Sequence, residues 1–520
     1  MQLASDLYGL FRLATGLRTF ARNPISLEES RALIRRGMQL REESFVRKVE
    51  LAIFGNAKSP YLRLFRGAGC ELGDVKRLAK SEGVEGALQI LRDSGIYVTF
   101  NEFKGREPIR RGSDTFSVHD RDFDNKLITS HFRGASGGSS GKPSRIVVDL
   151  EHIAQTAPHH RIWFEDHGLM DRPLLLWSSG VTSVANRHLL CTRYGMRFDK
   201  WFCSTKPSSV KDRLAAACVH TLVRIAAGIP RYDMVPVDEP WRISQYLVQI
   251  RGEGQRPCLI TTPSQAIQIC LAASDKGHTL EDVTFLLGAE PLTTTRRATI
   301  EESGARAVPT YGFAEGGNVG SQCRNAPVAD DIHISLDAYA VIQRPRSIAG
   351  SEKVDALLLT ALRPASPKVL FNTEIGDYAV MASHKCGCLF DEFDYHVHLH
   401  TIRSFDKLTG MGMTFIGADL FQIMEETLPL NFGGSAMDYQ LVELQDDRGL
   451  PCYQLRVSPE VGQIDERLLL ETFLNELGKQ WSVYRWMIKI WRDTDVLQVQ
   501  RERPATTPQG KVFPFRTLRE

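Results

Sequence analysis

Strand-like and helix-like segments alternate between Gly254 and Gly312, and this alternation constrains the fold more than any other feature of the sequence. β-rich runs at 257–261, 283–287 and 306–309 are separated by helical segments at 264–273 and 293–303. This rhythm is typical of a parallel sheet with helical crossovers. Ligands of such sheets bind at the carboxyl ends of the strands, so the loops after Leu287 and Pro309 are the first places to look for a site.

The two ends of the chain have a different texture. Apolar residues recur at helical spacing through 27–54 and 75–95. Near the other end, strand-like runs at 439–444, 453–457 and 483–491 accompany an amphipathic helix at 464–477. We therefore expect an α/β protein with a large N-terminal domain, residues 1–403, in which 1–110 are mostly helical. A small α+β C-terminal domain, residues 404–520, should follow, with the boundary near 403–412.

The composition excludes several functional classes. Lys and Arg total 64 against 62 Asp and Glu, a net charge of +2, which gives no electrostatic footprint for nucleic acid or a membrane surface. No stretch reaches the roughly 20 apolar residues of a membrane span. The 10 cysteines are scattered over 520 residues and do not form a disulfide framework. We expect a cytoplasmic protein.

A Gly/Ser-rich loop at 133–145 lies between two β-rich runs, 127–132 and 145–150. Its hydroxyls, glycines and lysine are Ser136, Gly138, Ser139, Ser140, Gly141 and Lys142, among others. Glycines let backbone N–H groups converge on an anion, while hydroxyls and a lysine add donors and charge. A phosphate-binding loop is therefore predicted; Pro143 and Ser136 stand where a Walker-type loop requires Ser/Thr and Gly. A flexible linker is the alternative.

The loop at 136–143 resembles the phosphate loop of adenylate-forming enzymes, the superfamily of acyl-CoA synthetases, adenylation domains and luciferases. Six further segments resemble the motifs of this superfamily in the same order: Gly-Ala-Glu-Pro at 288–291, Tyr-Gly-Phe-Ala-Glu at 311–315, Thr-Glu-Ile-Gly-Asp at 373–377, Arg403 with Asp406, Gly-Ala-Asp-Leu-Phe at 417–421, and Thr-Pro-Gln-Gly-Lys at 507–511. The resemblance runs from about residue 55 to the C-terminus and is closest to the phenylacetate-CoA ligase type.

The resemblance assigns roles to individual residues. It implies that Lys511 and Glu315 are catalytic, with Glu315 binding Mg²⁺, and that Asp406 is the hinge of a mobile C-terminal domain. The segment 417–421 would be the first strand and loop of that domain. Nucleotide binding is implied for the six loop residues named above and for Gly288, Glu290, Tyr311, Gly312, Asp377 and Arg403. Two departures stand out: Gly137 replaces a hydroxyl residue, and Phe405 stands where an acidic hinge residue is frequent.

A zinc site is also implied. Cys386-Gly-Cys388 places two thiolates close together, and in phenylacetate-CoA ligase-like proteins such a pair joins an earlier Cys and His, here Cys323 and His333. Three Cys and one His suit a closed tetrahedral structural site. Buried free cysteines are the alternative. His396, His398 and His400 are rival ligands or one polar face of a strand.

A further His pair does not match the acyl-transfer motif that it resembles. His159-His160 begins an acyl-transfer pattern, HHxxxDG, but Phe164 stands where Asp is required, so we interpret the pair as surface or structural residues.

The resemblance implies an AMP-forming acid–thiol ligase. ATP would activate a carboxylic acid as acyl-AMP with release of pyrophosphate, and coenzyme A is the expected acyl acceptor. An amine or a carrier protein is the alternative acceptor. A non-catalytic nucleotide-binding homologue is the alternative from another class. The cofactors implied are ATP, Mg²⁺, coenzyme A and structural Zn²⁺, and a homodimer is the candidate assembly. The sequence does not identify the acid.

Overall fold

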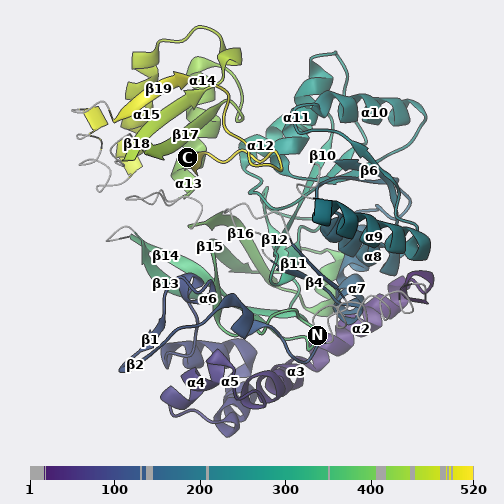
Figure 1. Ribbon diagram of the computed structural model, residues 1–520, viewed down its shortest axis with the longest axis vertical. Helices are drawn as coiled ribbons and strands as arrows, with labels where there is room; N and C mark the ends of the chain where they lie inside the picture. Colours follow the sequence, from purple (N-terminus) through teal and green to yellow (C-terminus); the bar gives the residue numbers. More distant parts are fainter. Residues whose placement is uncertain are drawn as a thin grey trace.

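The structure of the chain is a computed structural model. It describes residues 17, 19–128, 132–135, 145–205, 210–348, 352–405, 417–445, 451–480, 488, 491–492 and 496–518. The backbone is dominated by one sheet of twelve strands, ordered β13-β14-β15-β16-β12-β11-β10-β9-β8-β5-β6-β7. The molecule is α/β, as the sequence predicts (Figure 1).

One half of this sheet is parallel, and it contains the alternation predicted for 254–312. Its strands are β5 (Leu174–Trp177), β6 (Phe198–Cys203), β7 (Tyr232–Met234), β8 (Cys258–Thr261), β9 (Thr284–Leu287) and β10 (Arg306–Phe313). The helices of this half are α7 (Leu150–Asp166), α8 (Val181–Arg193), α9 (Val210–Ala227), α10 (Pro240–Gly252), α11 (Pro263–Ser274) and α12 (Thr294–Glu302). Every residue of β5 and β9 is buried, as expected for parallel strands covered on both faces.

The other half of the sheet is antiparallel. Its strands are β11 (Gly317–Ser321), β12 (Ile332–Ile334), β13 (Tyr339–Ile348), β14 (Glu352–Ala361), β15 (Thr373–Ser383) and β16 (Val397–Ser404). β10 joins the halves, because it pairs parallel with β9 and antiparallel with β11. Asp377 on β15 faces Ser404 on β16, and Tyr378 faces Arg403. The register therefore brings two predicted site residues to neighbouring positions.

Helices of the N-terminal segment cover the antiparallel half. They are α2 (Leu27–Gln39), α3 (Arg41–Lys48), the π-helix η1 (Val49–Phe54), α4 (Pro60–Gly67), α5 (Leu72–Asp93) and α6 (Phe100–Phe103). A capping box between Ser26 and Glu29 starts α2. The segment continues through β1 (Ile109–Arg111), β2 (Asp114–Phe116), the 3₁₀ turn η2 (Asp120–Phe123), β3 (Phe132–Ala135) and β4 (Arg145–Val148). Its apolar side chains share one core with β12–β16, so the helices belong to the large unit.

The residues after 416 form a separate unit with its own core. Its four-stranded sheet has the order β19-β18-β17-β20, from β17 (Tyr439–Gln445), β18 (Pro451–Val457), β19 (Leu497–Arg501) and β20 (Phe515–Thr517). Its helices are α13 (Gly417–Gln422), η4 (Ile423–Thr427), α14 (Leu428–Phe432), η5 (Pro459–Val461) and α15 (Glu466–Gln480). Figure 1 shows this unit, in yellow-green, next to α12 of the parallel half.

Two local predictions for this unit are wrong. A strand was expected at 483–491; the described residues of this run are Ile488 and Trp491, and both are helical, while the rest of the run lies outside the described residues. Ile488 and Trp491 are three residues apart and both enter the unit's core, which is the spacing of one helix face. The segment 417–421 was expected to be a strand and loop and is instead part of α13, where Leu420 and Phe421 are buried.

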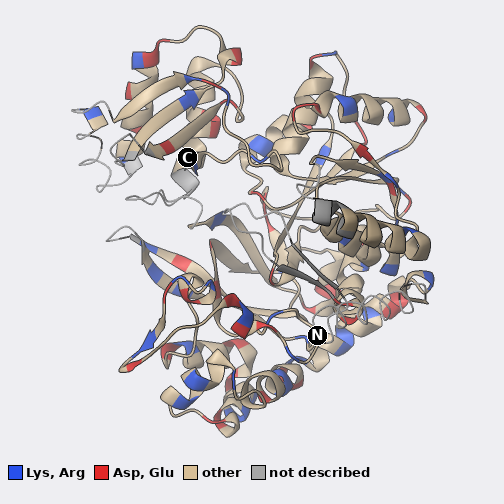
Figure 2. Cartoon of the chain, viewed as in Figure 1, with Lys and Arg blue, Asp and Glu red and all other residues tan. Residues whose placement is uncertain are grey.

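Charged residues of both signs are interspersed along the chain (Figure 2). This distribution agrees with the small net charge of +2. None of the described helices is long and apolar enough to cross a membrane.

Candidate active site and metal centre

A cavity of about 110 Å³ opens where the loop after β9 and the carboxyl-terminal part of β10 meet β15, β16 and the C-terminal unit. Its wall includes five residues that the sequence analysis proposed for nucleotide binding: Glu290, Tyr311, Gly312, Asp377 and Arg403. These residues come from strands far apart in the sequence. The topology brings them together because β10 lies at the centre of the sheet and β15 pairs with β16. The cavity therefore lies at the carboxyl end of β9 and β10, where an open α/β sheet binds its ligands.

Tyr311 and Asp377 contact each other across the cavity. The Tyr311 hydroxyl donates a hydrogen bond to Asp377 Oδ2 at 2.9 Å. Burial, together with the Asp377 carboxylate, raises the pKa of Tyr311 well above its usual range. The phenol therefore stays protonated as a donor. Gly376 precedes Asp377 with φ +90°, and a Cβ there would lie 3.1 Å from the Phe100 ring, so only glycine fits this approach without strain.

Arg403 is oriented by a residue that the sequence analysis missed. Its Nη1 donates to Asp330 Oδ2 at 3.2 Å, and the backbone N–H of Thr401 donates to the same oxygen at 3.1 Å. Asp330 also lines the cavity. The Arg403 guanidinium lies 5.3 Å from the ring centre of Phe421, which belongs to the C-terminal unit. No motif marked Asp330; only the position of an acidic pair just before His333 could have drawn attention to it.

Lys511 reaches the cavity from the C-terminal unit. Its Nζ donates to the backbone oxygen of Ala289, a cavity residue, at 3.3 Å. The loop that carries it is closed by two hydrogen bonds with Thr507: Lys511 N donates to Thr507 Oγ1 at 3.1 Å, and Thr507 N donates to Lys511 O at 3.0 Å. Gly510 has φ +77° within this turn. The motif at 507–511 therefore forms a tight loop that directs its lysine to the loop after β9.

A buried charge cluster, formed by Glu290, Arg296 and Glu425, joins the two units beside the cavity. Arg296 Nη1 donates to Glu290 at 2.9 Å, and its Nε donates to Glu425 at 2.8 Å. Arg296 also donates to the backbone oxygen of Val512, the residue after Lys511, at 3.0 Å. The three side chains are at most 3% exposed. Since an unpaired buried charge is costly, this interdomain cluster holds the C-terminal unit with Lys511 at the cavity.

The carboxylate of Glu290 is engaged within this cluster and by Ser264, whose N–H donates to it at 3.1 Å. Burial raises the pKa of Glu425, against the opposing effect of the neighbouring Arg296. Glu290 therefore lines the cavity, but its negative charge is paired with Arg296 in the interdomain cluster. Gly288 precedes this loop, and its N–H donates to Thr261 at 3.3 Å.

Glu315, the predicted magnesium ligand, forms an ion pair with Lys104 in the loop after α6. It follows β10 directly but is not part of the described cavity wall. A single carboxylate at the end of β10 is a suitable donor for Mg²⁺, which prefers a few carboxylates together with substrate phosphates. The residues present therefore fit the ion, on condition that Lys104 gives up its partner.

The predicted phosphate loop, with Ser136, Gly138, Ser139, Ser140, Gly141 and Lys142, lies outside the described residues, and so does the predicted hinge, Asp406. The strands on either side of the loop are described, and they pair antiparallel from Phe132 with Val148 to Ala135 with Arg145. The loop therefore lies between two paired strands, as the sequence indicated. The first of these strands is misplaced in the prediction, because Leu127 is in a turn and residues 133–135, which were assigned to the loop, belong to β3.

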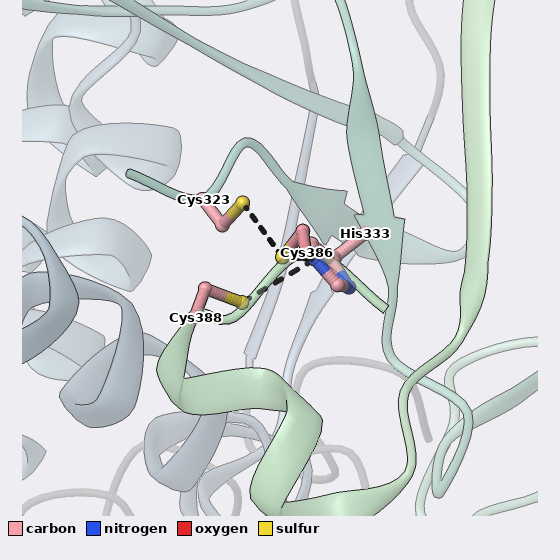
Figure 3. A group of neighbouring side chains, drawn as sticks. All are labelled: Cys323, His333, Cys386 and Cys388. Atoms are coloured by element: carbon pink, nitrogen blue, oxygen red, sulfur yellow. Dashed lines mark hydrogen bonds between the residues drawn. The ribbon is translucent and has the colours of Figure 1, made fainter. Parts of the chain in front are cut away.

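Four predicted zinc ligands converge in the antiparallel half. Figure 3 shows Cys386 between Cys323 and His333, with Cys388 at the start of the 3₁₀ turn η3 (Leu389–Phe393). The sulfur atoms of Cys323 and Cys386 are 3.5 Å apart, and His333 Nε2 lies 3.2 Å from Cys386 Sγ and 3.4 Å from Cys388 Sγ. A tetrahedral zinc ion with ~2.3 Å bonds to sulfur separates its ligands by ~3.5–3.8 Å, so the donor set fits zinc.

The thiols of this Cys/His cluster differ in their electrostatics. The hydrogen bond from Cys323, with a further one from His333, lowers the pKa of Cys388 to about 4. Burial raises the pKa of Cys386 to about 12. Of the three rival histidines, His398 is fully buried, whereas His396 and His400 are half-buried. The pair His159–His160 lies in α7, where His159 Nδ1 forms a hydrogen bond with Ser335 Oγ at 2.9 Å. His159 is buried, so we interpret the pair as structural and not as surface residues.

Comparison with known proteins identifies the class of fold. The chain has the α/β fold of adenylate-forming acyl-CoA ligases, as the resemblance predicts. A crystal structure of 2-hydroxyisobutyryl-CoA ligase in its postadenylation state, in complex with R3-HIB-AMP, matches with a TM-score of 0.52 and 15% identity, over 96% of this chain and 90% of that chain.

Two other matches are looser. An anthranilate CoA ligase in complex with anthranoyl-AMP has a TM-score of 0.44 and 14% identity, over 82% of this chain and 74% of that chain. Acetoacetyl-CoA synthetase from Streptomyces lividans has a TM-score of 0.41 and 13% identity, over 78% and 56%. No family model matches the sequence, and no curated protein matches it.

Proposed function

We propose that the protein activates a carboxylic acid as acyl-AMP, with release of pyrophosphate, and transfers the acyl group to a thiol, with coenzyme A as the acceptor. The observation that carries this proposal is the convergence of Tyr311, Asp377 and Arg403 on one cavity that Lys511 approaches from the other unit. The fold is that of acyl-CoA ligases. The phenylacetate-CoA ligase type remains our prediction for the subgroup.

The cavity offers a complementary partner for each part of a nucleoside. Tyr311 supplies an aromatic face for the adenine ring. Asp377 is an acceptor-only carboxylate with two oxygens, which suits the two ribose hydroxyls. Its present donor is the Tyr311 hydroxyl at 2.9 Å, so nucleotide binding exchanges one hydrogen bond for others. Arg403, held by Asp330, adds positive charge at the same wall.

The reaction then needs charge stabilisation more than covalent catalysis. A carboxylate oxygen of the acid attacks the α-phosphorus of ATP, the bond to the β-phosphate oxygen breaks, and pyrophosphate leaves with the electron pair. Lys511 would hold the carboxylate and α-phosphate oxygens in line, and the loop at 136–142 would hold the β- and γ-phosphates. Bound Mg²⁺ supplies neutralisation of phosphate charge, and Glu315 would hold it after releasing Lys104.

The second half-reaction requires the cavity to open to the acceptor. The thiol attacks the acyl carbon, AMP leaves, and the thiol proton passes to solvent. We propose that the C-terminal domain, residues 404–520, rotates about Asp406 to withdraw Lys511, which would break the contacts of Arg296 with Glu425 and Val512. If the acceptor is an amine or a carrier protein, it would react with the same acyl-AMP. A catalytically inactive nucleotide binder would bind ATP without forming acyl-AMP.

The Cys/His cluster is proposed as a structural zinc site. Cys323, His333, Cys386 and Cys388 are its ligands, and their separations of 3.2–3.5 Å support a single ion between them. When bound, the zinc ion supplies a cross-link between β12 and the turn before η3.

ATP–pyrophosphate exchange with a panel of aryl, alicyclic and fatty acids tests the proposed function. We expect acid-dependent exchange in the wild type and a loss of about 10²–10³-fold in Lys511→Ala. Lys479→Ala is the matched control, because Lys479 lies in the same unit on α15, is 67% exposed, and should leave exchange unchanged. Exchange in Lys511→Ala equal to the wild type would overturn the assignment. Mg·ATP binding without exchange for any acid would favour the non-catalytic binder.

A further inference from the structure

A second group of metal-binding side chains lies beside the Cys/His cluster. Asp331 comes directly before β12, His384 directly follows β15, and His398 is on β16. One donor atom from each of the three lies within 4.8 Å of the others. The strand register produces this arrangement, because His398 pairs with His333 on β12 and with Ala382 on β15. We name this group the Asp/His cluster.

Its polar atoms are buried and incompletely bonded. His398 and Asp331 are at most 1% exposed, and His398 Nδ1 donates to Asp331 Oδ2 at 2.8 Å. Among the described residues there is no hydrogen-bond partner for three buried atoms of the cluster: His398 Nε2, Asp331 Oδ1 and His384 Nε2. Buried polar atoms normally have partners, so three orphans in one cluster call for a common explanation.

A simple ion pair between Asp331 and His398 does not explain them. A protonated His398 would carry an N–H on Nε2 that lacks an acceptor, and a neutral one leaves there a lone pair that lacks a donor. The hydrogen bond to Asp331 assigns the proton to Nδ1, so the Nε2 lone pair is the free ligand atom. A carboxylate that orients a histidine through its other nitrogen is the usual outer partner in metal sites.

We propose that His384 and His398 bind a second divalent cation of the zinc class through their Nε2 atoms, with Asp331 as the outer partner of His398, and that this ion is distinct from the ion of the Cys/His cluster. Two imidazoles are suitable ligands for such an ion, and water would fill its remaining coordination positions. The rings of His384 and His398 are stacked at 3.8 Å, so binding requires His384, the half-buried member, to rotate until both lone pairs meet one ion. This proposal does not rest on the proposed acyl-CoA ligase activity.

The site would also support the nucleotide cavity. Asp331 is adjacent in sequence to Asp330, which holds Arg403 at 3.2 Å in the cavity wall. A cation on His398 would hold Asp331 through the hydrogen bond at 2.8 Å, and it would therefore fix the backbone that carries Asp330. The ring of His333, a predicted ligand of the other cluster, lies 3.8 Å from that of His398, so the two ions would be neighbours.

Metal titration of the stripped, full-length protein tests the proposal. Zinc content after saturation and gel filtration should be two equivalents in the wild type and one in His384→Ala and in His398→Ala. With Co²⁺, the wild type should show one ion with thiolate charge-transfer absorption and one without it. Both His variants should keep the thiolate band, whereas Cys386→Ser should lose that band and retain the other ion.

The control variant is His396→Ala, because His396 lies two residues before His398 and its side chain is 43% exposed. It should bind two equivalents. Circular dichroism establishes that each variant is folded, and His384→Ala is the milder change because this residue is half-buried. The proposal is overturned if the saturated wild type holds one equivalent or none, or if folded His384→Ala holds as much zinc as the wild type.

Discussion

The cavity and the two metal-type clusters lie in the same sheet but are held in opposite ways. In and beside the cavity, charged groups are paired with protein partners: Asp377 with Tyr311, Arg403 with Asp330, and Glu315 with Lys104. In the clusters, donor atoms converge on one another, and several have no partner among the described residues. A ligand of the cavity must therefore replace contacts that the protein groups already make with one another, whereas an ion in the clusters would bind atoms that lack a partner in the described part of the chain. Replaceable contacts suit a substrate that binds and leaves at each turnover, and unpartnered donor atoms suit an ion that stays bound.

The two regions also differ in how they are anchored. The clusters lie within the antiparallel half of one sheet, where strand register fixes their positions. The cavity lies between two units, each with a core of its own. Met437 and Val512 of the C-terminal unit pack into the core of the parallel half, and the interdomain cluster of Glu290, Arg296 and Glu425 also joins the units. Relative movement of the units would change the cavity and leave the metal clusters intact.

Breaking the interdomain cluster should have the largest effect. Arg296→Met leaves Glu290 and Glu425 buried without their partner, and we expect a loss of about 3–5 kcal/mol in the stability of the docked unit. Differential scanning calorimetry should show an earlier transition, and limited proteolysis should cut between the units. Adding Glu425→Gln should recover part of the loss. A transition at the wild-type temperature would mean that other contacts dock the unit.

Loss of zinc from the Cys/His cluster should have the second-largest effect on stability, and it should leave the interdomain cluster intact. Cys386→Ser, or chelation of the wild type, is expected to reduce the free energy of unfolding by roughly 3 kcal/mol, since a structural metal contributes directly to folding. Cys218→Ser is the matched control, because Cys218 is exposed and outside both clusters. Thermal melts with and without chelator measure the effect. Equal sensitivity of Cys386→Ser and Cys218→Ser would show that no structural ion is bound.

Asp377→Asn should weaken nucleotide binding without affecting the melt. The amide keeps the shape of the carboxylate but loses its charge and one acceptor, so the two ribose hydroxyls lose about 1.5–3 kcal/mol, or roughly 10–100-fold in Kd for Mg·ATP. Isothermal titration gives the Kd. Asp355→Asn, an exposed position on β14, is the control. A wild-type Kd in Asp377→Asn would place the ribose elsewhere.

Tyr311→Phe should have the smallest effect. The change keeps the aromatic face and removes only the hydroxyl that donates to Asp377, so the Kd for Mg·ATP should change by about 1 kcal/mol or less. Tyr311→Ala, which also removes the stacking face, should cost more. If the phenylalanine and alanine variants lose the same affinity in titration, the aromatic face does not contact adenine.

Local patterns in the sequence predicted much of the fold. The alternation at 254–312 corresponds to β8, α11, β9, α12 and β10, because buried parallel strands and their crossover helices have short, distinct periodicities. The motif residues Tyr311 and Asp377 do meet at the cavity, and Lys511 contacts Ala289 in its wall. The strand expected at 483–491 failed because apolar spacing over a few residues does not separate a short helix from a strand.

The partners of the site residues could not be predicted. Lys104 pairs with Glu315 over 211 positions, and Arg296 reaches Glu425 over 129. Nothing local in either sequence marks such a pair, since each is created by the packing of separate elements. The same holds for Asp330 with Arg403 and for the Asp/His cluster, which depends on the register of β12, β15 and β16.

Transfer of oxygen-18 from a labelled acid tests the central claim most directly. In acyl-AMP formation a carboxylate oxygen becomes bonded to the α-phosphorus, and it stays with AMP when the acyl group moves to the acceptor. With an acid that supports turnover and coenzyme A, mass spectrometry should find one labelled oxygen in AMP and none in inorganic phosphate. Label in inorganic phosphate, with ADP as the product, would contradict acyl-adenylate formation and the roles assigned to Asp377 and Lys511.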